Sequence, residues 1–179
     1  MIVLAGASAS GKTEVAKLLA KKYGITKVIT TTTREKRHGE EDGRDYFFIT
    51  KERFEEKIHE GDFVEYTLYN GNLYGSTKDQ IADNKCVVID PAGLRSYIAL
   101  NNPGIVTFFL EADEKTRKQR MIDRGDDLDK VESRIKHDRI AFKKKNIAKV
   151  DYIIDSSINR TIEVVTDEIY RIYAQKRGL

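Results

Sequence analysis

Short apolar runs alternate along the chain with segments in which apolar residues recur every three or four positions. The apolar runs lie at Ile2–Leu4, Val28–Ile29, Cys86–Asp90, Ile105–Leu110 and Tyr152–Ile154. The helical periodicity lies at Glu14–Tyr23, 113–145 and Ile162–Ile172. Runs of this length suit buried strands, and their alternation with helices is typical of a parallel sheet covered by helices. The pattern therefore predicts an α/β fold with a parallel-sheet core.

Residues 34–75 depart from that alternation. Asp45–Ile49 has the composition of a strand, and Thr50 is placed to cap a short helix that stops at Gly61. Apolar residues on both sides of Asn70-Gly71 predict a β-hairpin. We expect a small mixed-sheet insert here. In an enzyme that uses nucleotides, such an insert usually holds the second substrate.

A highly charged helical segment covers residues 113–145, and Gly125 divides it into two arms. Its arginines are Arg117, Arg120, Arg124, Arg134 and Arg139. One interpretation is that the arms bring guanidinium groups onto a bound phosphate. The other is a salt-bridged surface helix, because acidic residues such as Asp123 and Asp126 lie among the arginines. Only a phosphate site elsewhere in the chain favours the first interpretation.

Composition narrows the class of protein. The chain has 179 residues, of which 40% are hydrophobic and 34% charged, as expected for one globular domain rather than a disordered chain. A net charge of +3 argues against nucleic acid as a partner. The single cysteine, Cys86, excludes an internal disulfide and fits a reducing compartment. No apolar run is long enough to span a membrane, and the first strand leaves no room for a signal peptide. We expect a cytoplasmic enzyme with small-molecule partners, as a monomer or homodimer.

The strongest chemical signal lies directly after the first apolar run. Residues 6–13 are Gly6-Ala7-Ser8-Ala9-Ser10-Gly11-Lys12-Thr13, which matches G-x-x-x-x-G-K-[ST]. A strand before and a helix after this pattern make it a phosphate-binding loop. Its backbone N–H groups would surround the phosphates of a nucleotide, which the motif alone does not identify, and Lys12 would reach the β- and γ-phosphates. The Thr13 hydroxyl would bind Mg²⁺.

A second cluster of phosphate-binding groups follows in the chain. Arg34 and Arg37 lie three residues apart, and Tyr46 follows them. Arginine offers a planar fork for oxyanions and the tyrosine hydroxyl adds a neutral donor, so the three could hold one phosphate. Taken by itself, the segment is more typical of a charged, solvated loop.

Together these segments resemble the guanylate kinases over nearly the whole chain. The family has a phosphate loop followed by a segment like T-T-R-x-P-R-x-G-E-x-x-G-x-D-Y. Here residues 32–46 are Thr32-Thr33-Arg34-Glu35-Lys36-Arg37-His38-Gly39-Glu40-Glu41-Asp42-Gly43-Arg44-Asp45-Tyr46. The family also has F-[IV]-E-[WY] followed by G-N-x-Y-G-[ST]. The corresponding residues are Phe63-Val64-Glu65-Tyr66 and Gly71-Asn72-Leu73-Tyr74-Gly75-Ser76. The chain departs from the family pattern at Glu35-Lys36, where x-Pro is usual.

The resemblance implies a role for each matched residue. The ligands of the GMP monophosphate would be Arg34, Arg37, Tyr46 and Tyr74. Glu65 would accept hydrogen bonds from the guanine N1–H and amino group. Thr30 and Ser76 would lie near the guanine O6, and Asp90 would lie near the base. Lys12 and three arginines of the lid, Arg120, Arg124 and Arg134, would act on the transferring phosphoryl group.

The expected reaction is Mg²⁺-dependent transfer of the γ-phosphoryl group of ATP to GMP, and also to dGMP. The expected fold is a three-layer core of the P-loop NTPase type with an insert that binds GMP and a helical lid. Residues 1–33, 76–112 and 146–179 would form the core, 34–75 the insert and 113–145 the lid. Two alternatives remain open. One is a nucleoside monophosphate kinase for another base, and the other is a non-catalytic module that binds peptides.

Overall fold

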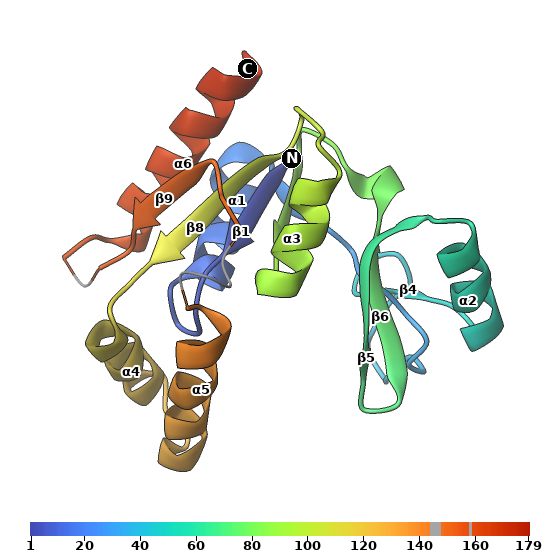
Figure 1. The fold of residues 1–179 in the computed structure, drawn as a ribbon, viewed down its shortest axis with the longest axis horizontal. Helices are drawn as coiled ribbons and strands as arrows, with labels where there is room; N and C mark the ends of the chain where they lie inside the picture. The colour runs from blue at the N-terminus through green and yellow to red at the C-terminus, as the bar shows by residue number, and fades with distance from the viewer. Residues whose placement is uncertain (144–147, 158) are drawn as a thin grey trace.

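The central sheet is parallel throughout in the computed structural model, which describes residues 1–143, 148–157 and 159–179. Its strand order is β2-β7-β1-β8-β9 (Figure 1). These strands are β1 (Ile2–Ala5), β2 (Thr26–Lys27), β7 (Lys85–Val88), β8 (Val106–Glu111) and β9 (Tyr152–Asp155). Ile2 in the middle strand pairs with Cys86 on one side and Val106 on the other. The parallel α/β core predicted from the sequence is confirmed.

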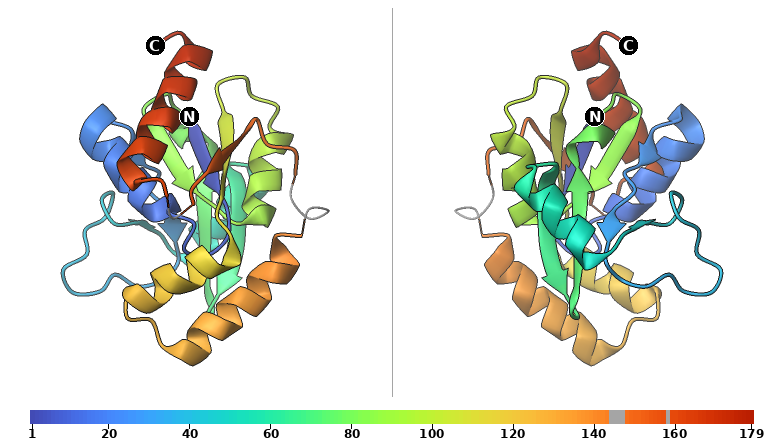
Figure 2. Two further views of the ribbon diagram at one scale, coloured as in Figure 1. Left: turned by 90° about the vertical axis from the view of Figure 1, so that its left-hand side faces the viewer. Right: turned by 90° about the vertical axis from the view of Figure 1, so that its right-hand side faces the viewer.

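Helices cover both faces of this sheet. On one face, Ile2 and Leu4 of β1 pack in one apolar cluster with α1 (Lys12–Tyr23) and α6 (Ile162–Arg177). On the other face, Val3 and Ala5 pack in a second cluster with α3 (Pro91–Ala99). Alternating side chains of a strand point to opposite faces, so a middle strand of a three-layer core is apolar at every position. Figure 2 shows the helices on the two sides of the sheet.

Residues between the core strands form a second, mixed sheet with order β4-β3-β6-β5. The strands are β3 (Thr31–Thr32), β4 (Phe47–Phe48), β5 (Phe63–Tyr69) and β6 (Asn72–Thr77). Helix α2 (Lys51–His59) packs on this sheet, with Phe54 stacked on Phe63 at 4.3 Å between ring centroids. The Thr50 hydroxyl caps α2 by accepting the Arg53 N–H. The predicted mixed-sheet insert, helix and cap are therefore present.

One predicted strand is displaced from its expected range, and another is shorter than expected. The expected strand at Val28–Ile29 is observed at Thr26–Lys27, because Ile29 leaves the sheet and bonds through both backbone groups to the Gln80 side chain. The strand expected over residues 45–49 is reduced to Phe47–Phe48. β4 is the edge strand of its sheet, and the Phe48 N–H donates to the Asp42 carboxylate instead of to a further strand.

Two further helices, α4 (Glu114–Asp123) and α5 (Leu128–Ala141), follow β8. We call them the lid helices. Gly125 lies in the turn between them, as the sequence predicts, and Met121, Val131 and Ile135 form a small apolar core of their own. In Figure 1 they lie at the carboxyl end of the central sheet, on the side opposite the insert. The predicted end of the lid at 145 lies outside the described residues, and the proposed division into core, insert and lid remains a prediction.

The 3₁₀ turn η1 (Lys78–Gln80) connects the insert back to the core. Asp90 then caps α3, because its carboxylate accepts the Gly93 N–H at 2.8 Å while Pro91 occupies the first turn. This cap fixes Asp90 at the carboxyl end of β7, beside the phosphate loop. Within the described residues, no helix is long and apolar enough to cross a membrane.

Candidate active site

The phosphate loop (residues 6–13) joins β1 to α1, as its motif predicts. The Lys12 ammonium donates to the carbonyl oxygens of Gly6 at 2.6 Å and Ala7 at 2.8 Å. The side chain is thus folded back over its own loop. Burial lowers the pKa of Lys12 to about 8, against the opposing effect of the Asp138 carboxylate. Lys12 therefore remains largely a cation at neutral pH.

Gly6 is the position in the loop at which a side chain cannot fit. A Cβ there would lie 2.6 Å from the Leu110 carbonyl oxygen and 2.8 Å from the Ser10 hydroxyl, and its φ is +146°. The loop therefore passes directly against β8. The Ser10 carbonyl also accepts a hydrogen bond from the buried Ser156 hydroxyl at 2.9 Å. Both contacts hold the loop backbone to the carboxyl end of the sheet.

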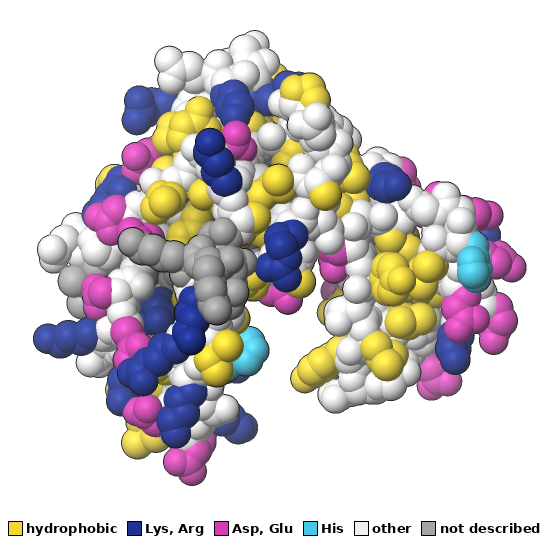
Figure 3. All heavy atoms as spheres, viewed as in Figure 1, with side chains coloured by type: hydrophobic (Ala, Val, Ile, Leu, Met, Phe, Trp, Pro, Cys, Tyr) yellow, Lys and Arg dark blue, Asp and Glu magenta, His cyan; other side chains and the backbone are white. Residues whose placement is uncertain are grey.

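Two of the clefts beside this loop are lined by Lys12. The first, of about 930 Å³, is lined by Gly6, Ser8, Lys12, Asp90, Arg95 and Asp138, among others. The second, of about 310 Å³, is lined by Ala9, Gly11, Lys12, Thr13, Glu14, Arg120, Arg124 and Ile162. The structure thus brings Lys12 and Thr13 together with two of the three lid arginines expected to act on phosphate. Figure 3 shows a wide hollow between the side that carries the lid helices and the insert.

A third cleft, of about 560 Å³, lies between the insert and α3, and we call it the base cleft. Thr30, Glu65, Ser76 and Asp90 all line it, so four residues expected near guanine converge. The Ser76 hydroxyl donates to Glu65 Oε1 at 2.7 Å. Burial raises the pKa of Glu65, and the nearby Asp90 charge raises it further, while Ser76 lowers it. The cleft therefore presents a half-buried carboxylate with one oxygen already oriented.

Arg34, Tyr46 and Tyr74 form one cluster in the insert. The Arg34 guanidinium lies over the Tyr46 ring at 5.3 Å, and the Tyr46 and Tyr74 rings lie 6.1 Å apart. Glu40 accepts hydrogen bonds from Arg34 at 2.7 and 3.0 Å and from the Arg37 backbone N–H at 2.8 Å. The Arg37 side chain is exposed. Arg34 is thus held by defined side-chain contacts rather than lying in a solvated loop. Glu40, which orients Arg34 and binds the Arg37 backbone, is a residue that sequence reasoning did not single out.

The lid arginines fall into two groups by their partners. Arg124 and Arg134 both pair with Asp126, at 2.9 Å in the case of Arg134, and both are exposed. Arg120 donates to the carbonyls of Ala9 and Ser157, each at 3.3 Å, and so contacts the phosphate loop.

The other two arginines of the segment join one lid helix to the other. Arg117 pairs with Asp138, and Arg139 pairs with Glu114. Four of the five arginines therefore form ion pairs, as the salt-bridge interpretation predicts, although Arg117 does so from a buried position.

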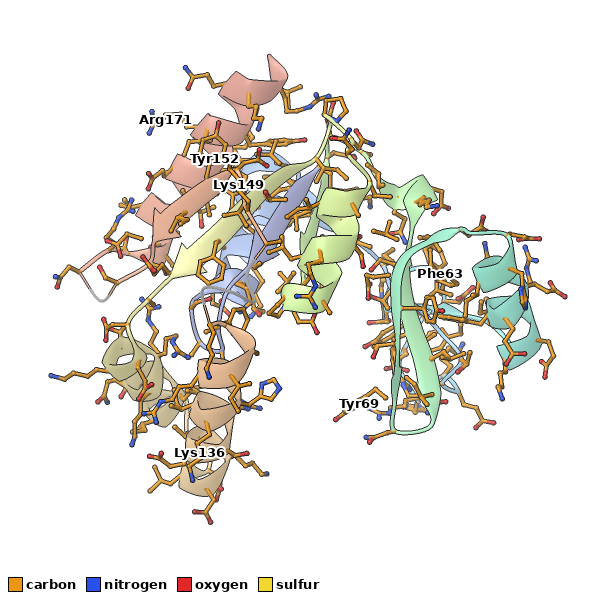
Figure 4. The ribbon with its side chains drawn as sticks, viewed as in Figure 1. Phe63, Tyr69, Lys136, Lys149, Tyr152 and Arg171 are labelled. Carbon is orange, nitrogen blue, oxygen red and sulfur yellow. The ribbon has the colours of Figure 1, made fainter. Side chains whose placement is uncertain are left out.

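The insert and the lid helices face each other across the hollow. Figure 4 shows Tyr69 at the tip of the β5–β6 hairpin on one side of the hollow and Lys136 of α5 on the other.

Asp138 and Arg95 line the first cleft, although no sequence motif indicated them. A buried carboxylate at a helical position carries no sequence signal of its own, because its neighbours come from distant parts of the chain.

Comparison with known proteins gives one consistent result. A family model described as guanylate kinase matches residues 1–171. Guanylate kinase of Anaplasma phagocytophilum is 34% identical over 96% of this chain and 84% of its own length. That of Clostridium tetani is 32% identical over 92% of this chain and 82% of its own. The crystal structure of the Anaplasma phagocytophilum enzyme superposes with a TM-score of 0.65 at 25% identity, covering 98% of this chain and 85% of that one.

Proposed function

The chain belongs to the guanylate kinase family and transfers a phosphoryl group from ATP to GMP, and on this premise we propose which of its residues perform the reaction. ATP binds with its phosphates on residues 6–13. GMP binds with its base in the base cleft and its phosphate at Arg34, Arg37, Tyr46 and Tyr74. Lys12, Arg120, Arg124 and Arg134 act on the phosphoryl group in transfer.

The observation that carries this assignment is the shared wall of two clefts. Val88, Ile89, Asp90 and Ala92 line both the first cleft, beside Lys12, and the base cleft, beside Glu65. These residues lie at the carboxyl end of β7 and the start of α3, where α/β sheets bind their ligands. We therefore place the base of GMP against Glu65 on one side of this wall and the phosphates of ATP on the other.

The chemistry follows from this juxtaposition. A phosphate oxygen of GMP attacks the γ-phosphorus of ATP, and the bond to the β-phosphate oxygen breaks, with ADP as the leaving group. No covalent intermediate with the protein is required, since positioning and neutralisation of charge supply most of the catalysis of phosphoryl transfer. Lys12 and the arginines hold the charge that spreads over the transferring group. Movement of the lid helices toward the insert would exclude water, which would otherwise hydrolyse ATP.

Thr13 is the protein ligand that we assign to Mg²⁺. The described residues contain no group of three or more His, Cys, Asp or Glu side chains that could hold a metal ion by themselves. This fits Mg²⁺, which commonly takes few protein ligands and completes its shell with waters and substrate phosphates. Thr13 lies in the first turn of α1 and lines the same cleft as Lys12. The ion would neutralise phosphate charge and align the ATP phosphates.

We extend the proposal to dGMP, because none of the residues assigned to GMP is expected to contact a 2′-hydroxyl.

A cytoplasmic location is supported by the thiol of Cys86, which is buried and free. Burial raises the pKa of that thiol to about 12, so it is unreactive. For the assembly state we propose a monomer or a homodimer.

A coupled assay of ADP release tests the assignment. Purified protein is given ATP and Mg²⁺ with GMP, dGMP, AMP, CMP or UMP in turn, and each monophosphate is varied to obtain kcat/KM. We expect GMP and dGMP to exceed the other three by orders of magnitude. A preference for another base would refute the assignment of Glu65, Thr30 and Ser76. Absence of transfer from folded protein to any monophosphate would instead support a non-catalytic module.

A further inference from the structure

A buried ion pair joins both lid helices to the phosphate loop. Asp138 of α5 and Arg117 of α4 are 4% and 7% exposed, and Arg117 Nη1 donates to Asp138 Oδ2 at 2.9 Å. The same oxygen accepts the Ser8 backbone N–H at 2.9 Å, and Asp138 Oδ1 lies 3.3 Å from the Ser8 hydroxyl, which donates to it. One carboxylate on α5 thus bonds to two other segments of the chain, α4 and the phosphate loop.

Neighbouring contacts strengthen this junction. Arg117 donates to the Ser8 carbonyl at 3.4 Å and to the Ala112 carbonyl at 3.3 Å. The ion pair therefore holds both the N–H and the C=O of Ser8. The next residue, Ala9, packs against the small apolar core of the lid helices formed by Met121, Val131 and Ile135. Because of these contacts, Ser8 cannot shift without disturbing α4 and α5.

Joining α4 to α5 does not require a buried ion pair. The same helices are connected at the surface by Lys118–Glu132 and by Arg139–Glu114. Replacing a buried ion pair with apolar residues of similar volume is often neutral or stabilising, because both charges lose their hydration on burial. What the Arg117–Asp138 pair provides, and the two surface pairs lack, is contact with the phosphate loop.

We propose that Asp138 is a positioning residue for phosphoryl transfer, which together with Arg117 fixes the phosphate loop at Ser8 to the lid helices. The inference rests on the proposed binding of ATP at this loop. Asp138 acts through Ser8 and Arg117 and lines the same cleft as Lys12. A loop held at Ser8 keeps its amide donors directed at the phosphates before they arrive. It also keeps Arg120, which contacts Ala9, in a fixed relation to the loop.

Two variants test the proposal against a purely stabilising role. Asp138→Asn removes the charge at nearly constant shape and leaves Arg117 buried without its counter-ion. The double variant Arg117→Met with Asp138→Leu removes both charges together, and water can reach the half-buried Ser8. For each we would measure the urea midpoint of unfolding, kcat, and KM for ATP and for GMP. We expect KM for ATP to rise about tenfold or more in both variants, because a charge-assisted bond to the loop is lost. KM for GMP should stay within about twofold.

Glu132→Gln is the matched control, since it breaks an exposed pair between the same helices and does not touch the loop. It should change neither KM. The double variant should unfold at a higher urea concentration than Asp138→Asn yet keep the raised KM for ATP. If it recovers both the midpoint and the KM of the wild type, the ion pair only stabilises the lid and the proposal is overturned. Equal increases in KM for ATP and GMP would also overturn it.

Lys12→Ala is assayed in the same series to separate this inference from the assignment of ATP to the loop. If Lys12→Ala turns over normally, ATP does not use this loop, and both proposals fall. If Lys12→Ala is severely impaired while the Asp138 variants match the wild type, only the role of Asp138 is refuted.

Discussion

Glu65→Gln is the substitution that most directly tests guanine recognition. Glutamine keeps the size of the side chain, and its amide oxygen can still accept the Ser76 hydroxyl that now lies 2.7 Å from Oε1. We assign the other oxygen to the guanine N1–H and amino group. In the variant an NH₂ group replaces this oxygen, so two sets of hydrogen-bond donors face each other. The substitution therefore changes recognition of the base while leaving the internal hydrogen bond of the cleft in place.

The expected loss follows from the bonds involved. A hydrogen bond to a charged acceptor contributes about 1.5–3 kcal/mol, and at least one such bond is replaced by an opposed pair of donors. We expect a total of about 2–4 kcal/mol, or roughly 30-fold to 1,000-fold in kcat/KM for GMP. IMP lacks the 2-amino group and makes one bond fewer, so its loss should be smaller. For AMP, the variant should lose nothing.

The same coupled assay measures this effect, with GMP, IMP and AMP varied at saturating ATP. Glu55→Gln is the matched control, because it makes the same change on the exposed face of α2 in the same insert. The pH profile adds a second readout. Burial raises the pKa of Glu65, and only the charged form accepts both guanine donors, so kcat/KM for GMP should fall as pH falls through this raised pKa. That step should be absent in Glu65→Gln. Equal losses of kcat/KM for all three monophosphates would refute the assignment. So would a fall of kcat/KM for GMP at low pH that is the same in Glu65→Gln as in the wild type.

Three further predictions concern the loop, the insert and the metal. Lys12→Ala should lower kcat/KM by about a hundredfold or more with unchanged circular dichroism, and near-normal turnover would contradict the loop assignment. Gly75→Ala should destabilise the protein by about 1–3 kcal/mol in urea unfolding and raise KM for GMP, because its Cβ would lie 2.7 Å from the Phe63 ring and 2.9 Å from the Glu65 carbonyl. An unchanged stability and an unchanged KM would mean that β5 adjusts freely to the added methyl group. Chelation by EDTA should abolish transfer and added Mg²⁺ should restore it, whereas activity that survives EDTA would argue against a metal at Thr13.

Sequence reasoning succeeded where the signal is local. The strand, loop and helix around residues 6–13, the Asn70-Gly71 hairpin and the Thr50 cap are all present, because each depends on residues a few positions apart. The placement of Val28–Ile29 failed for the opposite reason. Ile29 is taken out of the sheet by Gln80, which lies 51 positions later in the chain. Apolar patterning contains no information about such a competitor.

The candidate site shows the same division between local and distant information. The resemblance to guanylate kinases implies that Thr30, Glu65, Ser76 and Asp90 lie near the base, and the structure gathers them in one cleft. The sequence places Arg117 with the other lid arginines, because charge and helical spacing do not distinguish an arginine that faces solvent from one that faces a neighbouring helix. Its partner lies 21 residues away on another helix. Only the packing of α4 on α5 separates the two kinds.

Burial supplies the criterion that the sequence lacks for the arginines of the lid helices. Arg124 and Arg134 share the carboxylate of Asp126, and their side chains are 57% and 51% exposed. Exposed ion pairs contribute little to stability, so an arriving phosphate can replace Asp126 as their partner at small cost. Arg117 is 8% exposed in its side chain and pairs with an equally buried Asp138. Releasing it would leave two charges buried without partners, which is strongly destabilising. We therefore expect the exposed arginines to be the ones that move onto substrate, and the buried one to hold the loop on which they would act.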